Sequence, residues 1–250
     1  MNLIYQYWNG GELPPGAQAG NDNMRAYAER VGAQYRMDRD GNFMGAHSRY
    51  FDLLRPVYDD WFDQFDRVLF VDLDVFAVDG LTESIFGEPC ADIGMCEEPG
   101  MPEYRDGRKK HINGASDRVW ATLVRGAWDS DIPRDSKGRV RVFNSGVVMF
   151  TREGIRAARE SFVPVTDYVD SINTVRLSGF YGIDQNYMDA MVHRSPIDFT
   201  ELSPEWNRQV HGKDDGTTYD ERTPDTKFVH IQLSGADHND AAWHDAIVNP

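Results

Sequence analysis

The sequence predicts an α/β protein in which a mixed, mainly parallel central sheet is flanked by helices. Short apolar runs alternate with stretches whose apolar residues recur at helical spacing, which is typical of βαβ units. The run from Val68 to Val71 has no polar break, as expected of a strand that a sheet buries on both faces. With 250 residues and 40% hydrophobic residues, the chain can bury the core of one large domain.

The first half of the chain alternates between predicted strands and helices. A loop rich in glycine and proline is expected at 9–20, and a helix is expected to start at Asn21 or Asp22. Ser48 is expected to cap the next helix, and Pro56 is expected to end it. The strands expected in this half lie at 3–8, 33–37 and 68–71.

The second half contains a long polar segment, 97–139, that is rich in glycine, proline and charge. We expect a loop here, with a short helix within 117–127, because loops of this length in compact domains usually serve function. An active-site flap is the predicted role. Thr151 is expected to cap a helix, and another helix is expected to start at Gly182. Further strands are expected at 91–96, 140–150 and 228–232.

Two carboxylates, Asp72 and Asp74, directly follow the apolar run. Side chains alternate along a strand, so residues at i and i+2 point to the same side. Two buried acids repel one another unless a cation lies between them. The pattern therefore predicts a divalent metal site at the carboxyl end of a central strand, and the alternative is a strand that runs out into an acidic turn.

Composition excludes several classes of function. The net charge is −15, and the only basic cluster lies at 105–110, so nucleic-acid binding is not expected. The two cysteines, Cys90 and Cys96, are too few for a disulfide framework or a thiolate zinc site. The N-terminus lacks the features of a signal peptide, and no stretch approaches the roughly 20 apolar residues of a membrane helix. We therefore expect a cytoplasmic protein without an integral membrane segment.

Four short motifs stand in order along the chain. They are Leu69-Phe70-Val71-Asp72-Leu73-Asp74, Phe143-Asn144-Ser145-Gly146-Val147, Asp184-Gln185-Asn186 and Phe228-Val229-His230-Ile231-Gln232-Leu233-Ser234-Gly235, with Leu202-Ser203-Pro204-Glu205-Trp206-Asn207 between the last two. Each motif alone is common, but their order resembles the GT-A-fold glycosyltransferases of the glycogenin and lipopolysaccharide galactosyltransferase type, glycosyltransferase family eight. The resemblance covers roughly residues 3–235.

The resemblance implies a metal site and a nucleotide-sugar donor. Asp72, Asp74 and His230 would hold Mn²⁺ against the diphosphate of the donor, with Mg²⁺ as the second choice. Carboxylate and imidazole together suit manganese, whereas magnesium prefers oxygen ligands alone. Taken singly, His230 is better explained as a core histidine on a strand, and the order of the motifs reverses that preference. Asp72 could instead reach the ribose of the donor, or touch the metal through water.

The resemblance also implies residues around the transferred sugar. Asn144 would bind the sugar, with Gly146 allowing close approach of the backbone, and a plain tight turn is the alternative. Asp184 would bind sugar hydroxyls or cap the helix that it begins. Gln185 would face the reacting carbon. Because Gln185 is an amide, the resemblance implies a front-side transfer with retention, although Asp184 or Glu205 could serve as the base of an inverting reaction.

The remaining predicted contacts are with the nucleotide and the diphosphate. The family places a basic residue near the donor, and Arg49 and Arg55 are both candidates here. Its last motif normally closes with a lysine on the diphosphate, which this chain lacks, and His238 or arginines of the long loop could replace it. The residues predicted to bind the nucleotide-sugar are Tyr5, Tyr7, Trp8, Arg49, Arg55, Asp72, Gly235 and His238.

The predicted function is transfer of a hexose, most simply from a uridine diphosphate sugar, to a glycan, lipid-linked or protein acceptor that the sequence does not name. We expect one domain over 1–250, with a nucleotide-binding part at 1–96, the flap or acceptor loop at 97–139, and an acceptor and sugar part at 140–250. The sequence does not predict the oligomeric state. The alternatives are a haloacid-dehalogenase-type phosphatase, which also has Asp-x-Asp after an apolar strand, and a non-catalytic sugar-binding member of the fold.

Overall fold

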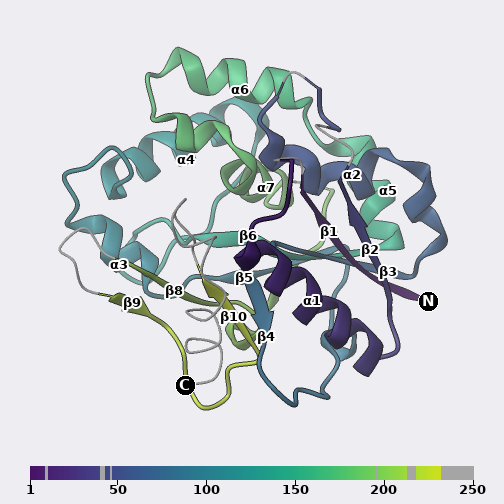
Figure 1. Ribbon diagram of the computed structural model, residues 1–250. Coiled ribbons are helices and arrows are strands. Elements are labelled where there is room, and N and C mark those ends of the chain that lie inside the picture. The colour runs from purple at the N-terminus through teal and green to yellow at the C-terminus, as the bar shows by residue number, and fades with distance from the viewer. Residues whose placement is uncertain (9–10, 40–42, 46, 195, 213–217, 232–250) are drawn as a thin grey trace.

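The structure is a computed structural model that describes residues 1–8, 11–39, 43–45, 47–194, 196–212 and 218–231 (Figure 1). A six-stranded sheet has the order β2-β1-β3-β6-β5-β7, and a four-stranded sheet has the order β4-β10-β8-β9. The strands of the larger sheet are β1 (Asn2–Tyr7), β2 (Gln34–Asp38), β3 (Arg67–Val71), β5 (Ile93–Glu97), β6 (Phe143–Thr151) and β7 (Phe199–Leu202). Those of the smaller sheet are β4 (Val75–Ala77), β8 (Arg208–Gly212), β9 (Thr218–Asp220) and β10 (Phe228–Ile231).

The larger sheet is mixed and mainly parallel, as predicted. Strands β1, β2 and β3 pair in parallel, and β5 and β7 also pair in parallel. Strand β6 lies between β3 and β5 and is antiparallel to both. Strands β3 and β5 therefore run in the same direction, and their carboxyl ends lie at one edge of the sheet.

Helices cover both faces of this sheet (Figure 1). Helix α1 packs on one face, and α2, α4, α5 and α7 contribute to the core on the other. The described helices are α1 (Pro15–Arg30), α2 (Arg55–Tyr58), α3 (Met101–Asp106), α4 (Gly114–Trp128), α5 (Arg152–Ser161), α6 (Val165–Thr174) and α7 (Asp184–Val192). None of them is long and apolar enough to cross a membrane.

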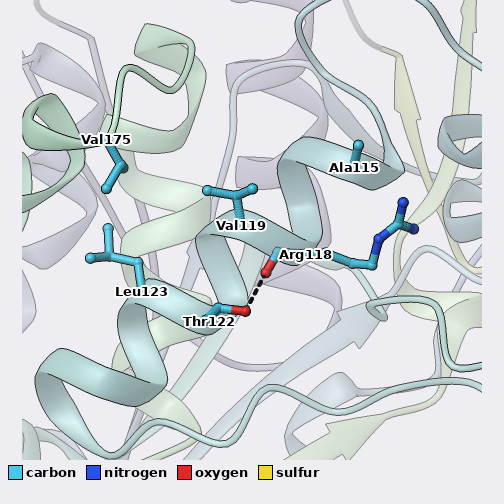
Figure 2. A pocket seen from close by; sticks show the side chains of 6 residues that line it. All are labelled: Ala115, Arg118, Val119, Thr122, Leu123 and Val175. Carbon is cyan, nitrogen blue, oxygen red and sulfur yellow. Dashed lines mark hydrogen bonds between the residues drawn. The ribbon is translucent and has the colours of Figure 1, made fainter.

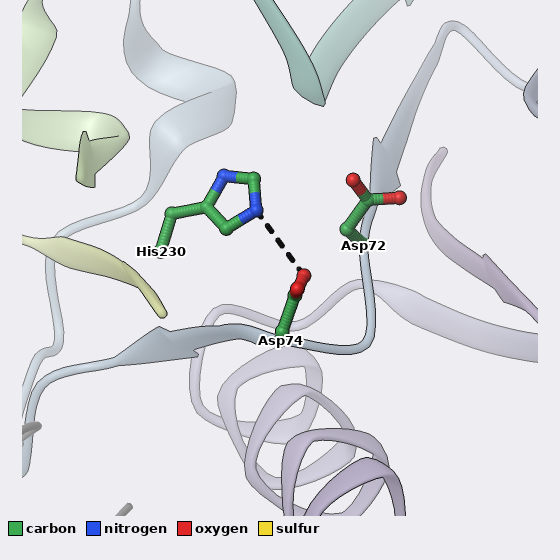
Figure 3. A group of neighbouring side chains, drawn as sticks. All are labelled: Asp72, Asp74 and His230. Atoms are coloured by element: carbon green, nitrogen blue, oxygen red, sulfur yellow. Dashed lines mark ion pairs between the residues drawn. The ribbon is translucent and has the colours of Figure 1, made fainter. Parts of the chain in front are cut away.

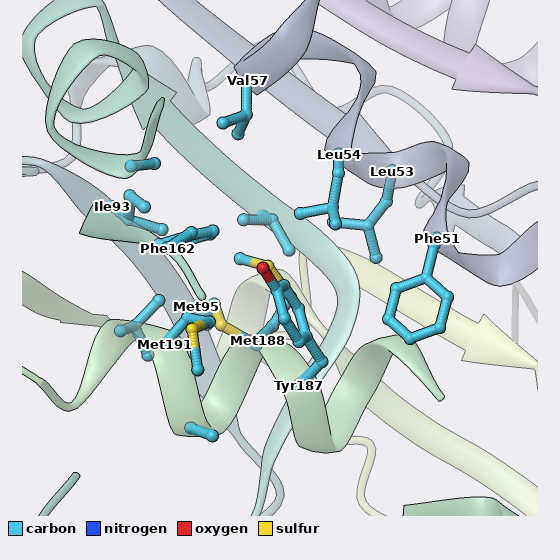
Figure 4. Close-up of a cluster of buried hydrophobic side chains, with 14 of the residues drawn as sticks. Phe51, Leu53, Leu54, Val57, Ile93, Met95, Phe162, Tyr187, Met188 and Met191 are labelled. Atoms are coloured by element: carbon cyan, nitrogen blue, oxygen red, sulfur yellow. The ribbon is translucent and has the colours of Figure 1, made fainter. Parts of the chain in front are cut away.

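The core explains why β3 has an unbroken apolar sequence. Val68 and Phe70 belong to the cluster on one face of the sheet, whereas Leu69 and Val71 belong to the cluster on the other. On the first face, Tyr187 and the methionines of α7 pack among side chains from the short helix Arg49–Leu54, from α2 and from β5 (Figure 4). The prediction that β3 is buried on both faces is confirmed.

Two helix boundaries differ from those expected, and a proline explains each. Helix α1 begins at Pro15, several residues before Asn21, because proline fits the first turn of a helix, where its missing N–H is not needed. Pro56 likewise lies in the first turn of α2 and does not end the helix. The predicted caps at Ser48 and Thr151 are confirmed: the Thr151 side chain accepts from the Gly154 N–H at 3.0 Å at the start of α5.

The segment 97–139 is not the long loop that was expected. It contains α3 and α4, and the side chain of Asn113 caps α4 by accepting from two backbone N–H groups. Trp120 and Val124 point from α4 into the main core. Helix α6 and the strands β4, β8 and β9 were also not predicted. Strands β4 and β9 have three residues each, too few to leave a clear pattern, and β8, Arg-Gln-Val-His-Gly, is mostly polar.

Candidate metal centre

Asp72 and Asp74 lie in the turn that joins β3 to β4, and not on the strand itself. The Val75 N–H donates to the Asp72 carbonyl at 3.2 Å, which closes the turn. The backbone of Asp72 is also held from both sides, by the Gly146 carbonyl at 2.8 Å and by the side chain of Gln6 at 3.1 Å. Alternation along a strand is therefore the wrong reason for their proximity. The turn brings the two carboxylates together.

His230 reaches the same turn from β10. Strand β10 pairs antiparallel with β4 and places His230 opposite Val75. The Ile231 N–H donates to the Asp74 carbonyl at 2.8 Å, which docks the two segments. His230 Nε2 lies 3.2 Å from Asp74 Oδ1. One ligand atom from each of Asp72, Asp74 and His230 lies within 4.8 Å of the others, and the three side chains face a common point (Figure 3).

The electrostatics of these three groups suit a cation. Burial, and next the charge of Asp74, hold the pKa of Asp72 well above its usual range. For His230, burial lowers the pKa, but the carboxylates of Asp74 and Asp72 outweigh it and raise the pKa overall. A divalent cation would relieve the repulsion between the carboxylates, and two oxygen donors with one imidazole form a donor set suited to Mn²⁺.

A second group of polar side chains lies beside this cluster. Asn144 and Ser145 are on β6, and Asp184 and Gln185 begin α7. The Asn144 amide donates to Gln185 Oε1 at 3.4 Å, and the Ser145 hydroxyl donates to Asp184 Oδ2 at 2.8 Å. Burial raises the pKa of Asp184 to about 6. Asp184 does not cap α7 through its side chain, because the N-cap position is Ile183.

The predicted sugar contact of Asn144 has little room. Its Oδ1 accepts from the Gly146 N–H at 2.8 Å and from the Asn207 amide at 2.9 Å. Its Nδ2 donates to Glu98 at 2.8 Å and to Gln185. A side-chain amide has two hydrogens and two lone pairs, so the protein occupies all of them.

The predicted nucleotide contacts divide into two groups. Tyr7 lies near the cluster, since the charges of Asp72 and Asp184 add to burial in raising its pKa. The Arg49 guanidinium lies 5.9 Å from the centre of the Trp8 ring. The contact of Tyr7, Trp8 and Arg49 with the donor stays a prediction.

The other predicted contacts lie elsewhere. Tyr5 is fully buried and packs edge-on against Phe62 at 5.0 Å, so its ring belongs to the core and does not line the site. Arg55 is held by ion pairs with Asp38 at 3.0 Å and Asp59 at 3.2 Å. The last two predicted residues, Gly235 and His238, fall outside the described part of the chain.

Sequence reasoning missed Glu98 and gave no role to Asn207 and Gln209. All three are buried and hydrogen-bonded to predicted site residues. A signal for Glu98 was present, because it directly follows β5, and the carboxyl ends of β3 and β5 meet at one edge. Asn207 and Gln209 gave no such signal, since the short strand β8 was not predicted.

A cavity of about 440 Å³ lies away from these residues (Figure 2). It is formed by the exposed side of α4 and by the residue that follows α6. Its lining is mostly apolar, and it shares no residue with the predicted site. The residues are Ala115, Arg118, Val119, Thr122, Leu123 and Val175.

Comparison with known proteins identifies the fold. No family model matches the sequence, and no curated protein matches it significantly. A glycosyltransferase involved in the glycosylation of the major capsid of PBCV-1 superposes with a TM-score of 0.53 at 14% identity, covering 99% of this chain and 98% of that one. The chain therefore has a glycosyltransferase fold.

Two further solved structures are similar at lower TM-scores. Mouse xyloside xylosyltransferase 1 gives 0.48 at 16% identity, covering 93% of this chain and 98% of that one. The bifunctional glycosyltransferase WbbM gives 0.44 at 14% identity, covering 98% of this chain and 44% of that one.

Proposed function

We propose that this protein is a metal-dependent glycosyltransferase that moves a hexose from a nucleotide-diphosphate sugar, a UDP-sugar in the first instance, to an acceptor. The convergence of Asp72, Asp74 and His230 on one point carries this proposal. That point lies beside the buried carboxylate of Asp184, on a fold shared with a glycosyltransferase. The GT-A glycosyltransferase family eight is the group whose motifs the sequence resembles.

Asp74 and His230 are the proposed direct ligands of Mn²⁺, with Mg²⁺ as the second choice. Asp72 binds the metal directly or through water, or binds the ribose of the donor instead. When bound, the metal supplies positive charge that stabilises the diphosphate as a leaving group. The Arg49 side chain is exposed and, among the described residues, makes aromatic contacts without an ion pair. We therefore assign the second positive charge of the donor site to Arg49 and not to Arg55.

Asp184 and Gln185 form the proposed sugar side of the site. Asp184 accepts hydrogen bonds from sugar hydroxyls, and its buried position strengthens them because water competes weakly there. Gln185 presents an amide to the reacting carbon, and an amide is a poor nucleophile. Transfer with retention by front-side attack follows, with the leaving phosphate taking the proton of the acceptor hydroxyl.

The same proposal covers the organisation of the chain. One domain spans 1–250, with the nucleotide on the side of residues 1–96 and the sugar and acceptor on the side of residues 140–250. Helices α3 and α4 replace the expected flap as the element that borders the acceptor, because Glu98 at the start of this segment touches Asn144. The cytoplasmic location predicted from the sequence belongs to this proposal as well.

A panel of nucleotide-sugars tests the proposal. Each is added with and without Mn²⁺, and the melting temperature is measured. We expect one uridine diphosphate sugar at about 100 times its Kd to stabilise the protein by about 2.7 kcal/mol when the metal is present. Stabilisation by no nucleotide-sugar would contradict the proposal, and metal-dependent hydrolysis of p-nitrophenyl phosphate would favour the phosphatase alternative.

A further inference from the structure

The orientation of the Asn144 side chain is determined by its neighbours. The backbone N–H of Gly146 can only donate, so the atom of Asn144 that faces it at 2.8 Å is the amide oxygen. The amide nitrogen then faces the carboxylate of Glu98 at 2.8 Å. Asn144 is 4% exposed, so water does not compete for these positions. Asn144 therefore presents an acceptor, and no other group, to Asn207.

That acceptor orients Asn207 in turn. The Asn207 nitrogen donates to Asn144 Oδ1 at 2.9 Å, so the Asn207 oxygen occupies the other end of the amide. This oxygen lies 3.1 Å from His230 Nδ1. An acceptor at Nδ1 favours the tautomer that carries its hydrogen there and leaves Nε2 with a lone pair. Nε2 is the nitrogen that faces Asp74.

We propose that Asn207 is a positioning residue that holds His230 with Nε2 ready for the metal, and that Asn144 serves to hold Asn207 and does not bind the sugar. This inference rests on the proposed metal site and names two residues that support it from behind. Groups that hydrogen-bond the second nitrogen of a ligating histidine commonly set its tautomer and ring orientation.

Gln209 is the other side chain that faces His230 Nδ1. Its Nε2 lies 2.9 Å from His230 Nδ1 and donates to Asn207 Oδ1 at 3.3 Å, so in this orientation Gln209 presents a donor to Nδ1. A half-turn of a side-chain amide exchanges its oxygen and nitrogen. The tautomer that ligates the metal selects the Gln209 oxygen, so Gln209 adapts to His230, whereas Asn207 is fixed by Asn144.

Mn²⁺ affinity, measured calorimetrically without nucleotide, tests this role. We expect Asn207→Leu to raise the Kd for Mn²⁺ about 10–100-fold, as loss of such a partner usually does. Asn207→Asp keeps an oxygen against Nδ1 but loses the hydrogen bond to Asn144 Oδ1, so its Kd should lie between those of the parent and of Asn207→Leu. The matched control is Asn23→Leu, because the Asn23 amide bridges the backbone N–H and carbonyl of Ala77 on β4 and lies outside the cluster.

Each result decides the matter. If the parent binds Mn²⁺ and Asn207→Leu binds it equally well, or if Asn23→Leu loses as much affinity, the positioning role is wrong while the proposed metal site stands. If the parent does not bind Mn²⁺, both the metal site and the positioning role fail. Melting curves establish that each variant folds. If Asn207→Leu does not fold, Asn207→Ser replaces it, because the serine side chain is too short to reach Nδ1.

Discussion

At the scale of single residues, the buried carboxyl group of Asp184 lowers the stability of the protein when it is charged. Asp184 is 8% exposed, and burial raises its pKa to about 6 from the usual 3.8. The folded protein therefore favours the protonated form. Stability due to this group is full below about pH 4 and is lost as the pH rises through about 6.

Replacement of Asp184 by asparagine should therefore stabilise the protein at neutral pH. The variant keeps an oxygen for the Ser145 hydroxyl but carries no charge. We expect Asp184→Asn to raise the free energy of unfolding by on the order of 2 kcal/mol at about pH 7.5, with little change at about pH 4, while sugar transfer falls. Urea unfolding at both pH values measures this. The exposed Asp170→Asn serves as the control, and destabilisation of Asp184→Asn at about pH 7.5 would contradict the interpretation.

Gly146 shows how little space the site has. A methyl group at this position would overlap the His230 ring and lie 2.8 Å from Asn144 Oδ1. We expect Gly146→Ala to destabilise the protein by about 1–3 kcal/mol, because a packed interior cannot accommodate it without strain. Mn²⁺ affinity should fall as well, since the imidazole must move.

Gly126→Ala is the matched control for Gly146→Ala. It lies inside α4 where an added methyl group meets no neighbour within 4 Å, so it should be neutral or stabilise the helix by about 0.5–1 kcal/mol. Calorimetric titration with Mn²⁺ and thermal unfolding compare the two variants. Equal Mn²⁺ affinity in Gly146→Ala and the parent would show that His230 is not held as tightly as the structure indicates.

At the scale of elements, α3 and α4 are part of the packed structure of the protein. Arg105 on α3 and Asp117 on α4 are both almost fully buried, and Arg105 Nη1 lies 3.3 Å from Asp117 Oδ1. The Tyr181 hydroxyl donates to the same carboxylate oxygen at 2.7 Å. The buried ion pair joins α3 and α4, and α3 begins just after Glu98. A flap that moves freely is not compatible with this pairing.

Removal of one partner tests how firmly these helices are joined. Arg105→Met leaves the Asp117 carboxylate buried without its cation, so we expect a loss of about 3–5 kcal/mol in the free energy of unfolding. The double variant Arg105→Met/Asp117→Leu should recover part of this loss, because the Asp117 carboxylate is gone, while the buried carboxylates of Glu98 and Asp189 still lack the charge of Arg105. A double-mutant cycle by urea unfolding measures the coupling. A single variant within about 0.5 kcal/mol of the parent would point to a loosely packed segment.

The elements also show what the sequence can predict. Val68 to Val71 predicted β3 because both faces of that strand are buried, and a strand covered on both sides leaves an unbroken apolar run. Helix α4 was underestimated because the polar and glycine residues around it resemble a loop, while its stability comes from contacts distant in sequence. The turn at Asp72 was mistaken for strand because the hydrogen bond from the Val75 N–H to the Asp72 carbonyl, which closes the turn, leaves no pattern in the sequence.

At the scale of the whole molecule, the candidate site lies where the chain passes from one sheet to the other. Strand β3 belongs to the larger sheet and β4 to the smaller, and the turn between them carries Asp72 and Asp74. His230 arrives on β10, the neighbour of β4. The motif order in the sequence indicated that these residues belong together. The supporting residues Asn207 and Gln209 could not be assigned, because their roles depend on how the second sheet pairs.

The central claim is that these two sheets assemble a metal site for sugar transfer, and Mn²⁺-dependent release of sugar from a uridine diphosphate sugar tests it most directly. The parent protein should release sugar with Mn²⁺ and lose this activity in EDTA, and Asp74→Ala should lower the rate by about 10²–10³-fold while its melting curve shows a folded protein. The exposed control Asp170→Ala should match the parent. Sugar release that persists in EDTA, or that survives unchanged in Asp74→Ala, would contradict the claim.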